Sequence, residues 1–201
     1  MAFFDEVSST REEILAAAYE ALCQHGYTAL TVEKIGEEFD KSTSLVYHHY
    51  DGKDELLLAC LEFLLDQYDE AFIDENLMDP QARLEESLAS FLVSEMPDEQ
   101  LRFMRVLVEL RAQAIHDERY REHFVRSDRL FQASLIDLIE AGIETEQFRD
   151  VDAEAVGVTL QTIMSGALVR TTTSDDDEWL EAVRGEVETY LETRLYQQDD
   201  D

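Results

Sequence analysis

The three lysines of the chain lie close together, among small polar residues. Lys34, Lys41 and Lys53 fall within 20 residues, and no lysine follows in the remainder of the 201-residue sequence. Between them, hydroxyl side chains begin at Ser42 and are followed by tyrosine and histidine. Ammonium groups, hydroxyl groups and the free N–H groups at the start of a helix all bind phosphate oxygens. The pattern therefore predicts phosphate binding, and small polar side chains in addition favour contact with the edges of DNA bases.

Two short helices joined by a turn are predicted to position these residues. Thr31 is expected to cap the first helix, and Ser42 to cap a second one that runs from Thr43 to about His49. A tight turn at Asp40-Lys41 joins the two, and a long helix begins at Asp51-Gly52. These are the proportions of a helix-turn-helix unit. In such a unit the second helix enters the major groove of DNA, and its N-terminal residues reach the bases.

The polar residues of this segment are predicted to contact different parts of the DNA. Thr43 and Ser44 are predicted to reach base edges, and the methyl groups of Leu45 to touch a thymine methyl. Tyr47 and His48, one turn further on, are predicted to reach phosphate oxygens. The complete predicted DNA-binding set is Thr31, Lys34, Lys41, Ser42, Thr43, Ser44, Leu45, Tyr47, His48 and Lys53.

The segment 31–56 resembles the TetR (tetracycline-repressor) family of transcriptional regulators, and the similarity extends over about residues 10–60. The sequence departs from the family pattern where Asp40 replaces the usual turn glycine, Lys41 an apolar valine and Ser44 a common glycine. The other positions that align with the pattern without a gap are Thr31, Val32, Ile35, Gly36, Phe39, Ser42, Val46, Tyr47, His49, Tyr50, Lys53 and Leu56, and Ile14 to Tyr27 are similar to the first helix of the family and its stop.

The resemblance implies a one-component regulator, most often a repressor, that binds double-stranded DNA as a homodimer. A small, largely apolar effector would tilt the fourth helix, change the spacing of the two recognition helices and release a palindromic operator. Such a release requires an effector with different affinities for the two states.

Helix signals recur along the whole chain, whereas strand signals are nearly absent. We predict an all-α fold of about nine helices, with a three-helix DNA-binding domain (residues 1–50) followed by a larger effector and dimerisation bundle (51–201). The first helix is expected to begin with a capping box at Thr10 and Glu13 and to stop at Gly26. Later helices are expected from Asp79-Pro80 to Pro97, over 98–115, from about 118 to a stop at Gly142, over about 152–171 and over about 176–196.

Two further surfaces are expected in the bundle. Large apolar residues on helices four to seven form either a plain core or, as the resemblance implies, an effector pocket with a few polar anchors. The predicted pocket residues are Phe63, Phe91, Phe103, Met104, Leu107, Arg111 and Phe131. Apolar residues at helical spacing on the last two helices form either internal core or the dimer interface. The predicted interface residues are Leu160, Ile163, Ala167, Leu180, Val183, Val187 and Tyr190.

The composition restricts the class of protein further. A net charge of −31 is unusual for a nucleic-acid binder, but 45% hydrophobic residues are ample for a packed core. Neither a bilayer-spanning segment nor a signal peptide is recognisable, and two cysteines fit a reducing cytoplasm. Scarce surface lysine combined with abundant Asp and Glu favours a halophile with molar cytoplasmic salt. The few lysines retained would then mark where a positive charge is needed.

Several alternatives carry little support in the sequence. His48-His49 lacks a third ligand, so no metal site and no cofactor are predicted there. His116 and His123 are expected to be solvated surface histidines, with a zinc or pH site beside Asp117 and Glu118 as the weaker alternative. Cys23 and Cys60 are expected to pack as small apolar groups, with a redox switch as the weaker alternative. No catalytic motif is present, so the chain is not expected to be an enzyme. A helical sensor that has lost DNA binding remains the alternative function.

Overall fold

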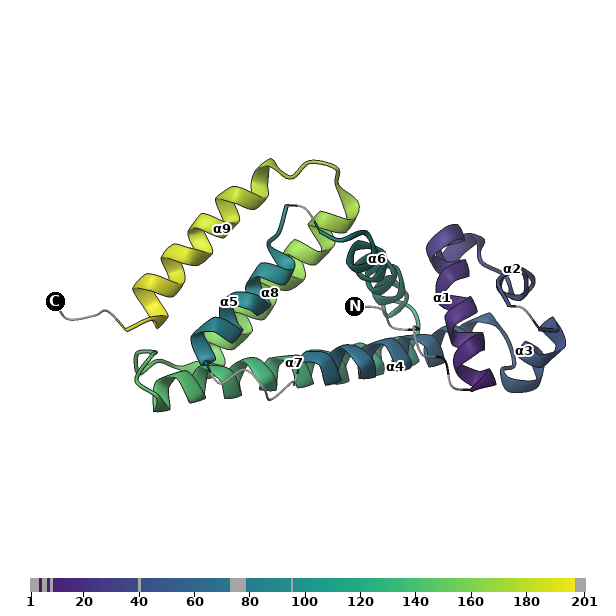
Figure 1. Ribbon diagram of the computed structural model, residues 1–201, viewed down its shortest axis with the longest axis horizontal. Helices are drawn as coiled ribbons and strands as arrows, with labels where there is room; N and C mark the ends of the chain where they lie inside the picture. The colour runs from purple at the N-terminus through teal and green to yellow at the C-terminus, as the bar shows by residue number, and fades with distance from the viewer. Residues whose placement is uncertain are drawn as a thin grey trace. The chain divides into compact units, whose positions relative to one another are not determined.

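The chain is built from helices. The computed structural model describes residues 4, 7, 9–39, 41–72, 79–94 and 96–197, with only the backbone for 68–72. The described part holds nine α-helices and one π-helical turn but no strand, which confirms the predicted all-α fold (Figure 1). They are α1 (Thr10–Ala29), α2 (Val32–Glu37), α3 (Thr43–His49), α4 (Lys53–Phe72), α5 (Pro80–Phe91), α6 (Asp98–Gln113), α7 (Glu118–Glu144), α8 (Ala153–Thr173), α9 (Glu178–Tyr190) and η1 (Leu191–Leu195).

These helices form two compact units. Unit 1 comprises Met1–Phe72 and Pro97–Ser127, and unit 2 comprises Ile73–Met96 and Asp128–Asp201. The three predicted DNA-binding helices thus share a unit with α4, α6 and the start of α7. A functional boundary at residue 50 stays a prediction. None of the described helices is long and apolar enough to cross a lipid bilayer.

Helix α1 is the centre of unit 1. It contacts α2 on one side and α6 on the other, and it also packs against α4 (Figure 1). The contact face of α1 carries three buried alanines, Ala17, Ala18 and Ala21. Alanine has a short side chain and the highest helix propensity, so these positions keep α1 helical while neighbouring helices approach closely. The position of the DNA-binding helices is therefore fixed against α4 and α6 through α1.

Side-chain caps begin α2, α3 and α5 where the sequence predicts them. Thr31 accepts a hydrogen bond from the Lys34 N–H at 3.3 Å, and Asp79 caps α5 with Pro80 in its first turn. The cap of α1 is Ser9, which accepts from the Glu12 N–H at 3.2 Å, so the predicted cap at Thr10 was one residue late. The predicted turn residue Asp40 lies outside the described residues.

The predicted stop at Gly142 was wrong, because α7 continues to Glu144. A Cβ at Gly142 would lie 2.1 Å from Cδ2 of Phe148, so this glycine admits an aromatic ring against the helix. The chain turns back just after the helix, with Glu146 at a φ of 59° and the Phe148 N–H donating to the Gly142 carbonyl at 2.9 Å. Phe148 then stacks on Tyr196 with 5.6 Å between ring centroids. The missing side chain at Gly142 therefore allows Phe148 to pack between the end of α7 and Tyr196.

Two other helix ends also differ from the prediction. Helix α5 ends at Phe91 rather than at Pro97, and the last helix is α-helical only to Tyr190. From Leu191 to Leu195 it widens into a π-helical turn. The guanidinium of Arg149 donates to the carbonyls of Glu192 and Thr193 in this turn, which is a tertiary contact that the helical periodicity could not reveal.

The Gly142→Ala substitution is expected to destabilise the chain. The 2% exposed Phe148 ring is held by its stack on Tyr196 and has little room to move away. Overpacking of this kind costs about 1–3 kcal/mol, which exceeds the gain of about 1 kcal/mol from replacing a helical glycine by alanine. Thermal unfolding followed by circular dichroism measures the difference.

Gly185→Ala on α9 is the matched control, because a Cβ there has no atom within 4 Å. It should raise the midpoint of unfolding slightly, by the helix-propensity gain alone. Equal midpoints for the two variants would contradict the packing role given to Gly142.

Candidate nucleic-acid interface

Helices α2 and α3 approach each other so closely at Gly36 that a side chain at this position of α2 would have no room. A Cβ at Gly36 would lie 2.3 Å from Oγ1 and 2.9 Å from Cγ2 of Thr43. The Thr43 side chain therefore points toward α2 and is half-buried. Ser42 caps α3 by accepting from the Ser44 N–H at 3.3 Å, and the two hydroxyl oxygens lie 2.8 Å apart. These contacts fix where α3 begins and how it lies on α2.

One exposed row on α3 carries the polar groups available to DNA. Ser44, Tyr47 and His48 are all exposed, and their spacing of i, i+3 and i+4 places them on one face of the helix. The Tyr47 side chain is 53% exposed, and its hydroxyl donates to Glu33 at 3.4 Å. Leu45 lies on the other side, half-buried against the core of unit 1. Among the residues predicted to read bases, Ser44 is thus presented to solvent, while Thr43 and Leu45 face the protein.

Each of the three lysines binds a group of the chain itself. The Lys34 ammonium donates to the Ala29 carbonyl at 2.7 Å, and the Lys41 ammonium forms an ion pair with Glu13. An ammonium group has three protons, so Lys34 with one partner and Lys41 with two, Glu13 and Thr10, each keep at least one donor for a phosphate. Lys41 directly precedes the Ser42 cap of α3 in the sequence, and Lys34 follows Glu33, whose carboxylate accepts from Tyr47.

Lys53 has a second role that the sequence did not indicate. Its ammonium donates to the Tyr27 carbonyl at 3.1 Å and lies 4.4 Å from the centroid of the Tyr27 ring. Tyr27 also donates through its hydroxyl to Asp54 on α4 at 3.0 Å and through its N–H to Glu109 on α6 at 2.7 Å. This Tyr27 junction (Tyr27, Lys53, Asp54 and Glu109) joins α1 to α4 and α6. The only signal for it in the sequence was the position of Tyr27 directly after Gly26.

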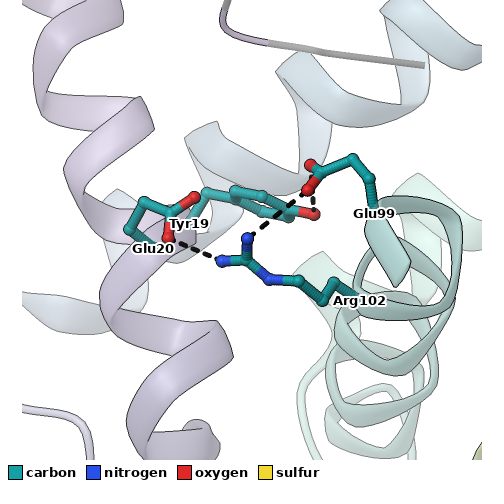
Figure 2. Close-up of polar contacts among 4 residues, drawn as sticks. All are labelled: Tyr19, Glu20, Glu99 and Arg102. Carbon is teal, nitrogen blue, oxygen red and sulfur yellow. Dashed lines mark hydrogen bonds and ion pairs between the residues drawn. The ribbon is translucent and has the colours of Figure 1, made fainter. Parts of the chain in front are cut away.

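A second polar contact joins α1 to α6. Figure 2 shows the Arg102 guanidinium between Glu20 of α1 and Glu99 of its own helix, at 2.6 Å and 3.4 Å. The Tyr19 hydroxyl donates to the same Glu99 at 3.4 Å. The Arg102 side chain is 37% exposed, so solvent screens these pairs and each adds less than about 1 kcal/mol to stability. The contact positions the two helices more than it stabilises them.

The surface around the exposed row of α3 carries mainly acidic groups. The backbone N–H of Glu33 itself, and then the Thr31 hydroxyl, lower the pKa of the Glu33 carboxyl, so this carboxylate beside Tyr47 stays ionised at neutral pH. Residues 1–56 hold 4 basic and 12 acidic residues. A phosphate backbone approaching this surface therefore meets negative charge together with the few cations.

The predicted pocket residues fall in both units. In unit 2, Phe91 and Phe131 lie together, with 6.2 Å between ring centroids. In unit 1, Phe103 and Leu107 belong to the hydrophobic core or pack against it, and the Arg111 guanidinium lies 4.4 Å from the centroid of Phe124. Of the others, Phe63 packs against the core of unit 1 and Met104 is buried. An effector pocket formed by all seven stays a prediction.

The predicted dimer residues divide between core and surface. Leu160, Ala167, Leu180 and Val187 are at most 5% exposed in the single chain, so they have no surface to offer a partner. Ile163, Val183 and Tyr190 are half-buried. The exposed face of α8 carries other small or apolar residues, namely Ala155, Val158, Thr159, Thr162, Gly166 and Val169. Any contact through α8 must use these residues rather than the buried stripe.

The cysteines and histidines show no arrangement for chemistry. Cys60 is buried, donates to the Leu15 carbonyl at 3.8 Å, and burial raises the pKa of its thiol to about 12, so it stays protonated. Burial also raises the pKa of Cys23. His116 is exposed and His123 half-buried. In the described part of the chain, no three His, Cys, Asp or Glu side chains are grouped to hold a metal ion.

Helix α3 is capped, carries an exposed polar row and packs at a glycine of the short helix α2. This is the arrangement of a DNA-binding helix-turn-helix. The family model for bacterial regulatory proteins of the tetR family matches residues 14–60. The model for the C-terminal domain of BetI-type transcriptional repressors matches residues 70–195. The chain belongs to the TetR family. It is a DNA-binding transcriptional regulator of the repressor type.

Similar proteins support this membership over nearly the full length. A TetR transcription regulator from Haloarcula marismortui is 39% identical, with a TM-score of 0.82 over 92% of this chain and 97% of that one. The transcriptional repressor AcnR of Corynebacterium glutamicum is 26% identical over 94% of this chain and 96% of its own. A regulator from Saccharomonospora viridis, solved in complex with choline, is 18% identical with a TM-score of 0.76 over 94% of this chain and 98% of that one, and shares the fold.

Proposed function

We propose that this TetR-family regulator binds a palindromic operator as a homodimer in the cytoplasm and is released by a small-molecule effector. The observation that carries the proposal is the exposed row of Ser44, Tyr47 and His48 on α3. In a dimer with twofold symmetry, two such rows face successive turns of one side of the DNA. The Ser42-capped start of α3, together with Lys34 and Lys41, would contact the phosphates.

Binding of the chain to its own upstream region is the direct test. A gel-shift or fluorescence-anisotropy experiment in molar KCl should show a complex that specific competitor DNA removes and random DNA of equal length does not. If both competitors act equally, the protein has no operator in that region. If no DNA of either kind binds, the chain is a helical sensor without DNA binding.

We propose that the homodimer forms through the exposed face of α8. A Cβ at Gly166 has no atom within 4 Å in the single chain, so a larger residue there fits the monomer and would obstruct only a partner. The Gly166→Arg variant is therefore expected to be monomeric and folded, since it places a charged side chain in an apolar contact. Light scattering after size exclusion measures the mass. Ala112→Arg, on an exposed position of α6, is the control and should remain dimeric. A dimeric Gly166→Arg variant would move the interface elsewhere.

The effector is proposed to bind among the large apolar residues predicted from helices α4 to α7. The choline complex of the Saccharomonospora viridis regulator supports a small-molecule ligand for this fold without identifying the one used here. A candidate ligand that releases the protein from its operator DNA in a gel-shift experiment would identify the effector.

We further propose that the protein works in a cytoplasm of high salt, as its net charge of −31 and its three lysines support. Most DNA-binding proteins release cations from DNA on binding, so their affinity falls steeply with salt. Here carboxylates such as Glu33 would approach the phosphates, and cations would be taken up to compensate. The expected slope of log affinity against log KCl is shallow or positive. A loss of affinity by about a thousandfold between low and molar KCl, as several released cations would cause, is the contrary result.

A further inference from the structure

Unit 2 contains a cavity that none of the predicted pocket residues lines. Its volume is 540 Å³, within the range of small-molecule sites. It lies between α5 and the end of the chain, where α9 passes into the π-helical turn. The floor is apolar and comes from both sides, with Leu88 and Leu92 on one and Val187 and Leu191 on the other. A space of this size with an apolar floor can hold the hydrocarbon body of a small ligand.

The polar groups around this cavity are mostly carboxylates. Glu85 of α5, Glu188 of α9 and Glu192 of the π-helical turn contribute three negative charges. The one basic residue of the lining, Arg184, donates through Nε and Nη2 to the Leu92 carbonyl, at 3.1 Å and 2.5 Å. Its donors are therefore directed at the end of α5. The lining favours a cation over a neutral molecule and disfavours an anion.

An aromatic wall completes the lining. Tyr196 lines the cavity, and its ring is fixed by the stack on Phe148. Burial, and then the neighbouring Glu85 carboxylate, raises the pKa of Tyr196, so the phenol stays neutral. A neutral aromatic ring attracts an organic cation through its π face. Carboxylates and an aromatic ring around an apolar floor are the groups that recognise an ammonium group with a hydrocarbon body.

The shape of this wall is set before any ligand binds. The π-helical turn that carries Leu191 and Glu192 is held by Arg149, whose guanidinium donates to the Glu192 carbonyl at 3.2 Å and whose N–H donates to the Leu195 carbonyl at 2.8 Å. Short π-helical turns occur frequently at functional sites, because they displace side chains from the regular helical position. Here the widened turn brings Leu191 and Glu192 to the cavity.

We infer that the cavity between α5 and the end of α9 binds a small organic monocation, an ammonium group on an apolar body. The inference goes beyond the proposed function, because the site is separate from the predicted effector residues and its ligand can be tested without DNA. Occupation would join α5 to α9 in unit 2 through one ligand.

Benzyltrimethylammonium is a suitable probe, with benzyl alcohol as its neutral counterpart and benzylsulfonate as the anion. Isothermal titration of the full-length protein, at the lowest KCl concentration that keeps it folded, should give one bound cation per chain. Benzyl alcohol should bind more weakly and benzylsulfonate not at all. If benzyl alcohol binds as tightly as the cation, the charge plays no part and the inference fails. Absence of cation binding overturns it as well.

Two matched double variants distinguish cation binding at this cavity from attraction of the cation by the net negative charge of the chain. The pair Glu188→Gln and Glu192→Gln removes two lining charges and should weaken cation binding about fivefold, as expected for partly exposed charge pairs. The pair Glu181→Gln and Glu186→Gln removes two exposed charges of α9 outside the lining and should leave the affinity unchanged. Equal effects of the two pairs would mean that the net charge alone attracts the cation, which contradicts a site.

A filled cavity gives an independent test. Ala89 lines the cavity and is exposed, so Ala89→Phe is expected to fold normally and abolish cation binding. Circular dichroism checks the fold, and Ala89→Leu is a smaller substitution for use if the phenylalanine variant is unstable. If these variants instead lower the mass of the dimer while the wild-type protein binds no cation, a second copy of the chain occupies the groove, and the inference is overturned.

Discussion

Replacing Tyr47 by alanine is expected to lower operator affinity by about a hundredfold or more while leaving the fold intact. A hydrogen bond to a charged phosphate contributes about 1.5–3 kcal/mol. Each proposed dimer presents two copies of the residue, and losses at distant sites add, so at least about 3 kcal/mol is lost, which corresponds to a factor above 100. Fluorescence anisotropy with the operator DNA measures this loss.

The fold should tolerate this substitution because Tyr47 contributes little to packing. The side chain is 53% exposed, and its one hydrogen bond within the described chain is the 3.4 Å contact with Glu33. The unfolding midpoint should therefore stay within experimental error of the wild type. Tyr47→Phe keeps the ring and removes only the hydroxyl, so its affinity should fall nearly as far as that of the alanine variant if the hydrogen bond to phosphate carries the contact. Wild-type affinity in the alanine variant would exclude Tyr47 from the interface.

Lys53 illustrates why a variant of another predicted contact is less informative. Its ammonium binds the carbonyl and the ring of Tyr27, which in turn joins α1 to α4 and α6. Removing the lysine would change this junction as well as any phosphate contact. A loss of DNA binding in that variant has two explanations, whereas the loss at Tyr47 has one.

The helix-turn-helix was predictable because its signals are local. The caps at Thr31, Ser42 and Asp79 each act within three residues, so the sequence alone indicates where α2, α3 and α5 begin. The end of α7 was not predictable in the same way. Gly142 stands where a helix stop signal is expected, but its missing side chain makes room for the ring of Phe148, which lies beyond the end of the helix. A glycine at such a position either ends a helix or leaves room for a packed side chain. The sequence is the same in both cases, so only the observed contact with Phe148 distinguishes the two roles.

The surfaces of the C-terminal part were less predictable because periodicity shows only which face of a helix is apolar. The stripe of Leu160, Ala167, Leu180 and Val187 is real, but it is buried in the chain itself. The cavity at the end of α9 depends on a π-helical turn and on contacts from Arg149, neither of which leaves a periodic signal. Candidate sites formed by residues far apart in sequence could therefore be identified only from the structure. The same holds for the contact between Glu20 and Arg102.

Gly36→Ala is the second variant for which a large effect is expected. The new Cβ would lie 2.3 Å from Oγ1 and 2.9 Å from Cγ2 of Thr43, so α3 must move away from α2 or Thr43 must change its rotamer. Overpacking of this size costs about 1–3 kcal/mol if it is not relieved, and relief by movement of α3 would shift the recognition helix in both subunits. Operator affinity is therefore expected to fall by at least about tenfold, the equivalent of 1.4 kcal/mol.

The effect should depend on Thr43, and a double-mutant cycle measures that dependence. Thr43→Ala removes Oγ1 and Cγ2, the two closest atoms, and leaves its Cβ in a tight contact of 3.1 Å with the new methyl group. The Gly36→Ala and Thr43→Ala double variant should thus recover most of the lost affinity. The single variant Thr43→Ala distinguishes the two roles given to this residue. If Thr43 serves packing, the variant binds the operator nearly as the wild type does. If its hydroxyl reads a base, the variant loses affinity for the operator but keeps its affinity for random DNA, and the double variant recovers nothing.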